Sequence, residues 1–429
     1  MRRILALVAS LYILFPVTAI EPSALNLTRL KGLEELTDNR CCLEDSCGFL
    51  WIGTSNGLYC YDGRHKFAFN VANSTDEGQT SLAVSSLLED GSRLWVGTAD
   101  GLYILHRDLL TPNTSLREQR RTRNPYFEQF TCRTRYGVVV SCEVTRLVRT
   151  RQGDILICTL GQGFFVYKPD QDVLLQNSRY GSFISDAVED EEGNVFFASM
   201  DQGALVEISL EGEVRGEHAL PLYHYTKHQL KVFRNGGDIY VGLRNTLYRY
   251  SQGKAIEPVA SVPTEGFIQH IARASENQWM LSTTQGLWLY DAQGGGMERC
   301  GNGTTANKRL SSQSVRFVNN TQKRICILTD TGIDFSNPLL SNMDFIPLPP
   351  AQGNGEARQV TAFCYIKEAR QLFVGTTQGL YYGNDEQLQL HPCAALGNEA
   401  VTALCQDGDQ LLVGTAENGL AGLNLAGDV

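Results

Sequence analysis

The chain has 429 residues, with 47 acidic and 37 basic side chains and a net charge of −10. This acidic balance argues against general nucleic-acid binding, which needs a basic surface. Hydrophobic residues make up 42% of the chain, but no run after the N-terminus is long enough to span a membrane.

Residues 1–19 have the pattern of a secretory signal peptide. Arg2 and Arg3 give a positive start, Ile4–Val17 is apolar, and the small residues at 17–19 suit cleavage. An uncleaved anchor is the alternative, although the apolar run is short for a bilayer. We expect an exported, periplasmic protein whose mature chain begins near residue 20.

One segment then recurs along the whole chain. Its first copy is Leu50-Trp51-Ile52-Gly53-Thr54, followed by Asn56-Gly57-Leu58. The nine copies begin at Leu50, Leu94, Ile155, Val195, Ile239, Trp279, Ile325, Leu372 and Leu411. A period of about 44 residues suits four short strands with their turns, and it is too long for a β-helix coil and too short for a sandwich. The sequence predicts an all-β protein, a β-propeller of about nine four-stranded blade repeats.

Each copy has the local chemistry of a blade. An apolar, β-prone run is followed at the fourth position by glycine, where we expect a close approach or a kink. A turn that needs positive φ comes next, and glycine fills it in every copy except the fifth, which has Thr246. Before each run lies another strand of small and β-branched residues, which suits a crowded position near the propeller axis.

An insertion separates the second copy from the third. It combines arginines with aromatic residues, and that mixture suits an anionic sugar, because arginine binds acidic groups and rings stack on sugar faces. The predicted ligand-binding residues are Arg117, Arg120, Arg121, Arg123, Tyr126, Phe127, Arg133 and Arg135. The alternative is a solvated charged loop that offsets an acidic protein. Trp288, on a return strand, is the most open tryptophan candidate for binding.

No catalytic, metal or cofactor site is predicted. His224 and His228 are four apart, but their surroundings indicate a strand or loop rather than the helix that a chelating pair would need. The glycines at 294–296 suit a flexible turn rather than a phosphate loop.

The 12 cysteines do not have the spacing of a disulfide scaffold. Cys42, Cys364 and Cys405 are expected in one column of the repeat, opposite Leu88, as small buried hydrophobes. Cys158 and Cys326 are expected to be buried in repeat strands too. A hairpin disulfide between Cys132 and Cys142 stays open.

A proline-containing stretch, Pro338–Gly355, divides the copies. We favour one seven-bladed ring over residues 20–341, with residues 342–429 forming two blades that begin a second ring. One ring of eight or nine blades is the alternative. Residues 25–30 are expected to add a strand that completes the last blade of the ring.

The copies resemble the two-component regulator propeller repeat. Its pattern is matched by Asp45, Gly48, the Leu50–Thr54 run, Gly57-Leu58 and Tyr61-Asp62. The middle copies depart from it, with Cys158, Ala198, Ser282 and Leu328 at the fourth position. The resemblance covers residues 25–429. It implies the periplasmic sensor part of a hybrid two-component system that recognises an oligosaccharide and signals to a histidine kinase, although this chain carries no kinase.

Two other functions stay open. Some propellers are lyases, which would need a histidine and a carboxylate on one face, and others are protein-interaction scaffolds. The expected partners are an oligosaccharide or another small ligand and a histidine kinase, with homodimer formation left open.

Overall fold

The computed structural model describes residues 25–424 apart from 30–31, 34, 70, 72–80, 110–125, 132–139, 178, 222–229, 304–307, 322–323, 337–347, 349–357 and 385–388. The chain forms two compact units, residues 1–341 and 342–429. Across the described residues the structure is built from antiparallel strands, with short 3-10 turns at η2 (Arg107–Leu109) and η5 (Ala394–Leu396). No helix in the described part is both long and apolar enough to cross a membrane.

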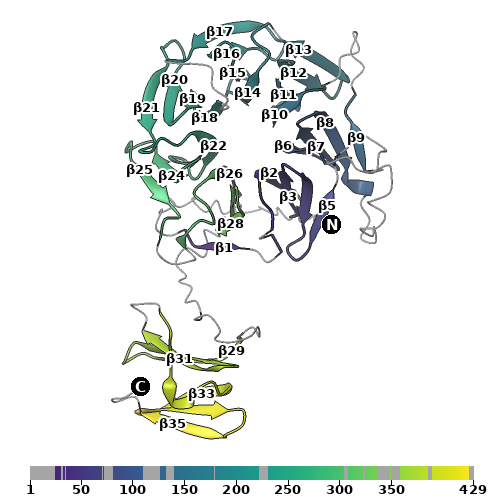
Figure 1. Ribbon diagram of the computed structural model, residues 1–429. Coiled ribbons are helices and arrows are strands. Elements are labelled where there is room, and N and C mark those ends of the chain that lie inside the picture. The colour runs from purple at the N-terminus through teal and green to yellow at the C-terminus, as the bar shows by residue number, and fades with distance from the viewer. Residues whose placement is uncertain are drawn as a thin grey trace, which may run out of the picture. The chain divides into compact units, whose positions relative to one another are not determined.

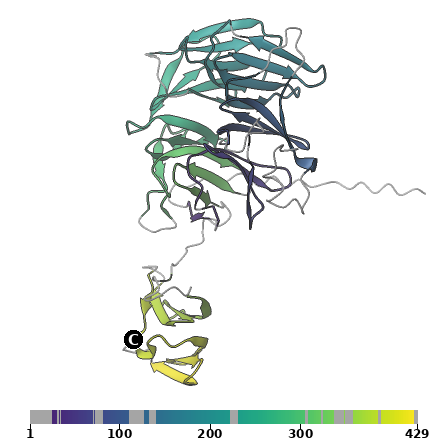
Figure 2. The same ribbon diagram turned by 45° about the vertical axis from the view of Figure 1, so that its right-hand side comes forward.

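The described part of the first unit contains seven four-stranded sheets arranged around a centre (Figures 1 and 2). The first three are β2 (Asn39–Glu44), β3 (Leu50–Thr54), β4 (Gly57–Tyr61) and β5 (Lys66–Phe69); β6 (Val84–Asp90), β7 (Arg93–Thr98), β8 (Gly101–His106) and β9 (Phe127–Gln129); and β10 (Glu143–Arg149), β11 (Ile155–Leu160), β12 (Phe164–Lys168) and β13 (Val173–Asn177).

The next three sheets are β14 (Ile184–Glu189), β15 (Val195–Ser199), β16 (Ala204–Ile208) and β17 (Val214–Ala219); β18 (Lys231–Asn235), β19 (Asp238–Leu243), β20 (Thr246–Tyr250) and β21 (Glu257–Ser261); and β22 (Ile268–Arg273), β23 (Gln278–Thr283), β24 (Gly286–Asp291) and β25 (Met297–Cys300). The seventh sheet combines β26 (Val315–Asn320), β27 (Ile325–Thr329) and β28 (Ile333–Ser336) with β1 (Leu27–Arg29). The first strand of each of the first six sheets, and β26 in the seventh, borders the centre of the ring (Figure 1).

The ring is closed where the seventh sheet meets the first, and we call this contact the seam. The N-terminal strand β1 pairs with β28, with Thr28 opposite Phe335, which confirms the strand expected from residues 25–30. The side-chain amide of Asn39 on β2 donates to the backbone oxygen of Thr329 at 3.3 Å. Arg324 binds both carboxylate oxygens of Glu44, with nitrogen–oxygen distances of 3.0 and 2.7 Å.

Side-chain packing between neighbouring sheets explains the glycine at the fourth position of the repeat. A Cβ on Gly53 would lie 2.5 Å from Cys41 Sγ on its own sheet and 2.7 Å from Val84 Cγ1 on the next, and one on Gly97 would lie 2.7 Å from Val144 Cγ1. In both copies the close neighbours are thus side chains of inner strands, including a β-branched one on the next sheet, rather than a backbone. Small residues at this position therefore let neighbouring blades pack closely.

Two side chains explain other fixed positions of the motif. The Asp45 carboxylate accepts hydrogen bonds from the backbone of Cys47 and Phe49 and from Trp51 Nε1 at 2.8 Å, so it both shapes the turn and satisfies the buried indole. Thr54 Oγ1 accepts from the Asn56 N–H and donates to the Gly57 oxygen, which closes the hairpin at a glycine with φ of 117°. In the fifth copy, which lacks this glycine, Arg244 takes the positive φ instead, at 54°.

The expected cysteine column is wrong by one residue. Cys42 pairs with Ile52, the third position of its copy, whereas Cys364 and Cys405 pair with Phe373 and Leu412, the second position. The turn of the first copy has five residues, an odd number, whereas the turns of the eighth and ninth copies have four and two, and this changes the pairing by one residue. Cys42, Cys158 and Cys326 are buried as expected, but Cys364 is only partly buried and Cys405 is exposed.

The second unit contains two sheets that pack face to face (Figure 2). The strands are β29 (Val360–Ile366), β30 (Gln371–Thr376), β31 (Gly379–Asn384) and β32 (His391–Pro392), then β33 (Val401–Asp407), β34 (Gln410–Thr415) and β35 (Leu420–Asn424). Their shared core includes Phe373, Leu380 and Val401. Large apolar side chains on their outer faces stay exposed, with Phe363 at 75% and Leu420 at 70%.

Candidate functional site

Most of the predicted binding insertion lies outside the described residues. These positions are Arg117, Arg120, Arg121, Arg123, Arg133 and Arg135. His224, His228 and Cys132 also lie outside the described part, while the Cys142 thiol is 3.2 Å from Gln162 Oε1. Tyr126 and Phe127 are described, and both are partly buried against the core between the first two sheets.

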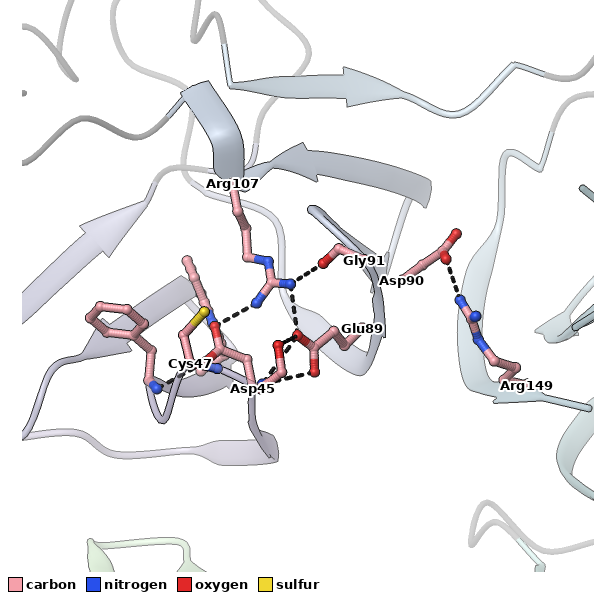
Figure 3. Close-up of polar contacts among 10 residues, drawn as sticks. Asp45, Cys47, Glu89, Asp90, Gly91, Arg107 and Arg149 are labelled. Carbon is pink, nitrogen blue, oxygen red and sulfur yellow. Dashed lines mark hydrogen bonds and ion pairs between the residues drawn. The ribbon is translucent and has the colours of Figure 1, made fainter. Parts of the chain in front are cut away.

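The insertion begins directly after η2, where Arg107 connects the first two sheets. Figure 3 shows its guanidinium pointing toward Asp45 and Glu89. Arg107 Nη1 lies 2.6 Å from Asp45 Oδ2, and Nη2 lies 2.7 Å from Glu89 Oε1 and also donates to the Gly91 oxygen. Ser46 Oγ donates to the same Glu89 at 2.6 Å. These contacts fix one end of the insertion to the ring, and each of the three charged groups already has a partner of opposite charge, so they support the fold rather than offer a site.

The expectation that Trp288 is open is wrong. Only 7% of the residue is exposed, and it packs in the core around Trp279. The Arg299 guanidinium carbon lies 5.8 Å from the centre of the Trp288 ring, so a cation occupies the face where a sugar would stack. The strand that follows the hairpin, β24, is therefore buried as fully as the strand before it, β23.

A different group of polar residues gathers around the centre of the ring. In every sheet of the ring, one inner-strand residue pairs with the fourth position of the repeat, and we call these seven the axial column. They are Cys41, Ser86, Arg146, Asp186, Lys231, His270 and Phe317. The strands that carry them border the centre of the ring (Figure 1).

At three of the seven positions of the axial column, the side chain links its sheet to the next one. An inner strand has a sheet partner on one side only, so its other edge carries unpaired backbone groups. Ser86 Oγ accepts from the Leu147 N–H at 2.9 Å, and Asp186 Oδ2 accepts from the Val232 N–H at 3.1 Å. Acceptor side chains at these positions therefore join one blade to the next, and His270 Nδ1 faces Val318 N at 3.5 Å in the same manner.

Arg146 and Lys231 cannot accept a backbone N–H of the next sheet in this way, because neither side chain has a hydrogen-bond acceptor. Arg146 Nε lies 3.4 Å from Asp186 Oδ1, and the Arg146 side chain is 35% exposed while that of Asp186 is 6% exposed. One carboxylate therefore faces two cations. The column carries a surplus of positive charge at the centre of an otherwise acidic protein.

The electrostatics of this group agree with that surplus. Burial, together with the charges of Arg146 and Lys231, holds the pKa of His270 well below its ordinary value, so this imidazole is neutral at pH 7. Burial also lowers the pKa of Lys231, and the Asp186 carboxylate offsets part of that effect. His270 stacks on Phe317, with ring centres 4.0 Å apart, which places an aromatic surface beside the two cations.

The sequence motif did not reveal this group. The repeat consensus covers the second strand and the hairpin, whereas the axial column lies on the first strand, where each copy has a different residue. A search of the first strands for charged residues among small and β-branched ones finds Arg146, Asp186 and Lys231, because charge on a predicted inner strand is unexpected.

No protein-family model and no curated protein sequence matches the chain. Solved structures do. The extracellular domain of a hybrid two-component system from B. thetaiotaomicron superposes with a TM-score of 0.58 at 18% identity, over 93% of this chain and 53% of that one. A second such domain from the same organism gives 0.56 at 14% identity, over 94% and 59%. Virginiamycin B lyase from Staphylococcus aureus gives 0.52 at 11% identity, over 73% and 98%.

These likenesses establish the class of fold, which is a β-propeller. The chain spans little more than half the length of the sensor domains that it resembles. The repeat pattern in the sequence and the structural likeness agree on this fold.

Proposed function

We propose that this protein is the periplasmic ligand-binding part of a two-component sensor, and that its ligand is an acidic oligosaccharide bound at the centre of the ring. In this proposal residues 20–341 form a seven-bladed propeller, and residues 342–429 provide two blades of a second one. A histidine kinase, on the same protein or another, receives the signal. The likeness to extracellular sensor domains over 93% of the chain supports the sensor role.

The charge of the ligand is argued from the axial column. Acceptor side chains at Ser86 and Asp186 link the blades. Arg146 and Lys231 stand at equivalent positions, cannot accept a hydrogen bond, and bring positive charge to the centre of the ring. A carboxylate or sulfate on a sugar binds such cations through charge-assisted hydrogen bonds. The neighbouring His270–Phe317 pair offers an aromatic surface of the kind on which sugar rings stack. The arginines of the insertion add further positive charge.

The test is calorimetric binding of a panel of uronate- and sulfate-bearing oligosaccharides, with their neutral counterparts as reference. We expect saturable binding of at least one acidic member. Arg146→Met and Lys231→Met should each weaken it roughly tenfold, the worth of one charge-assisted hydrogen bond. Arg146→Lys, which keeps the charge, should recover part of the affinity.

Arg149→Met is the matched control. Arg149 lies on the same strand, and its side chain is 39% exposed. It pairs with Asp90, which is not a member of the column, and Figure 3 shows this pair. Equal losses in Arg146→Met and Arg149→Met would contradict an axial site. Binding of neutral sugars alone would contradict the acidic ligand, and no binding across the panel would contradict the oligosaccharide.

A lyase is the second candidate, favoured by the superposition over 98% of the virginiamycin B lyase chain. The column holds His270 and the carboxylate of Asp186, but Asp186 is engaged by Arg146 and by the Ala187 and Val232 N–H groups. Product analysis in the same binding experiments distinguishes the two functions, because a sensor returns its ligand unchanged.

A further inference from the structure

Two cysteines meet at the seam of the ring. Cys42 on β2 and Cys326 on β27 are 284 positions apart, yet their sulfur atoms are 3.5 Å apart. The residues are 5% and 2% exposed, and both belong to the core that joins the first sheet to the seventh. We propose that these two residues form a disulfide that locks the ring closed.

The neighbouring cysteine shows that this placement is specific. Cys41 is also buried, at 3% exposed, but successive residues of a strand point to opposite faces. Its sulfur therefore lies at the other face of the first sheet, 3.9 Å from the Val84 oxygen on the second sheet. Of the two adjacent cysteines, the strand presents only Cys42 to the seam.

The two thiols need little movement to bond. A disulfide requires about 2.05 Å between sulfurs, so the pair must close by about 1.5 Å, which small side-chain rotations provide. The amide of Asn39 and the Arg324–Glu44 ion pair are non-covalent links across the seam. The β1–β28 pairing inside the seventh sheet, which joins the two ends of the ring, is non-covalent too. A covalent link here would close a loop that contains almost the whole ring.

The chemistry is thiol–disulfide exchange with a small disulfide such as oxidised glutathione. One cysteine thiolate attacks that disulfide and releases a glutathione thiolate; the second cysteine then displaces the other glutathione. The two cysteine thiols lose two protons and two electrons, and glutathione disulfide is reduced to two glutathione molecules. Formation of the bond in the cell rests on the proposed periplasmic location, because that compartment is oxidising.

Because both cysteines are buried in the closed ring, we expect the bond to form before the ring closes. Burial, with the nearby Cys326 thiol, raises the pKa of Cys42 well above its ordinary value, so Cys42 in the folded seam is not a reactive thiolate. Both cysteines are also buried and out of reach of a small disulfide. The exchange must therefore take place while the first and seventh sheets are still apart. Once the ring has closed, the same burial keeps reductants from the bond.

The experiment uses the full chain, reduced and denatured, then refolded with reduced and oxidised glutathione or with dithiothreitol alone. Free thiols are blocked in denaturant, and the protein is digested with trypsin. Cleavage after Arg40 and Arg64 leaves Cys42 in one peptide with three other cysteines, while Cys326 is alone in residues 325–358. Fragmentation of the linked peptide pair must therefore locate the bond at Cys42.

We expect the Cys42–Cys326 link only in the glutathione sample, with a melting temperature raised by roughly 5 °C or more over the reduced sample, because the closed loop is long. Cys41→Ser, the matched control, should keep the link. Cys42→Ser should lose both the link and the temperature difference.

Recovery of Cys42 and Cys326 as blocked thiols after oxidative refolding, or a bond from either to another cysteine, would overturn the proposal. The peptide analysis of the unsubstituted chain is sufficient for this test, so the test does not depend on whether a variant folds. The result is independent of ligand binding, so failure of the disulfide and failure of the proposed sensor role are separate outcomes.

Discussion

The ring and the two-sheet unit use the same repeat but give one of its positions opposite surroundings. The leucine paired with the fourth position is Leu58 in the first copy, Leu102 in the second, Leu380 in the eighth and Leu420 in the ninth. The first three are at most 1% exposed, whereas Leu420 is 70% exposed. The residue type and the strand are the same, so only the presence of a following sheet differs.

The inner strands show the same contrast on their opposite face. Cys42 and Phe363 both pair with the third position of their copies. Cys42 is covered by the seventh sheet across the seam and is 5% exposed, whereas Phe363, at the start of the second unit, is 75% exposed. A blade therefore lacks a complete core of its own, and each of its two faces is buried by a neighbour.

The largest expected effect contrasts two leucines of the second unit. Leu380→Ala should cost about 2–5 kcal/mol of local stability, because it leaves a cavity between two packed sheets. Leu420→Ala should change stability by no more than about 0.5 kcal/mol, as expected for a surface substitution. Hydrogen exchange of peptides from β30, β31 and β34 measures both. Equal losses would show that Leu420 is covered in solution, and the contrast between the two faces would then fail.

A second pair tests the fourth position itself. Gly97→Ala would place a Cβ 2.7 Å from Val144 on the next sheet, and overpacking of this kind costs roughly 1–3 kcal/mol. A Cβ on Gly414 would meet only its own sheet, with Thr402 Oγ1 nearest at 3.2 Å. We therefore expect Gly414→Ala to lower the free energy of unfolding by less than Gly97→Ala does.

The readout differs between these two variants. All four tryptophans lie before residue 342, so their fluorescence during urea unfolding reports the ring alone. Gly97→Ala should shift that transition, while Gly414→Ala should leave it unchanged and alter only hydrogen exchange in β33–β35. An unchanged fluorescence transition in Gly97→Ala would mean that Val144 moves aside at little cost.

The period and the hairpin motif were sufficient to predict the strands and turns of each copy, because these depend on local chemistry. The added strand β1 was expected from the way in which closed propellers complete their last blade, and it pairs with the distant strand β28. No comparable signal in the sequence indicates the side-chain contacts between blades. Trp288 was expected to be open because its own strand does not cover it, and the cover comes from a neighbouring sheet. The cysteine column was wrong because the first copy has an odd number of turn residues and the eighth and ninth have an even number, which changes the pairing of Cys42 by one residue.

The axial column was missed for a related reason. Its members come from seven different copies, and no single copy contains more than one of them. Arg146, Asp186 and Lys231 become a group only when the ring closes and brings their strands together. The arginine insertion was recognisable from composition alone, and its role in binding stays a prediction.

The smallest expected effect is on the stability of the fold at low pH. It compares Glu89, in a contact between two sheets, with Glu399, in a contact inside one sheet. Burial raises the pKa of Glu89, but hydrogen bonds from Ser46 and the charge of Arg107 outweigh it and hold the pKa below the ordinary value. Glu399 in the second unit also has a lowered pKa, through hydrogen bonds from Asn418 and Thr415 of its own blade, but it is fully exposed.

A carboxylate with a lowered folded-state pKa stabilises the fold above its unfolded-state pKa, and this stability is lost as the pH falls through the folded-state value. The ring should therefore weaken below about pH 4.5, the ordinary pKa of a glutamate. Glu89→Gln should make the tryptophan-detected transition less stable at neutral pH and less dependent on pH below that value. Glu399→Gln should leave this transition unchanged at every pH, because it lies in the other unit. If Glu89→Gln kept the full acid dependence, the ionised contact between the first two sheets would contribute nothing to the closed ring, and apolar burial alone would account for the difference between the ring and the two-sheet unit.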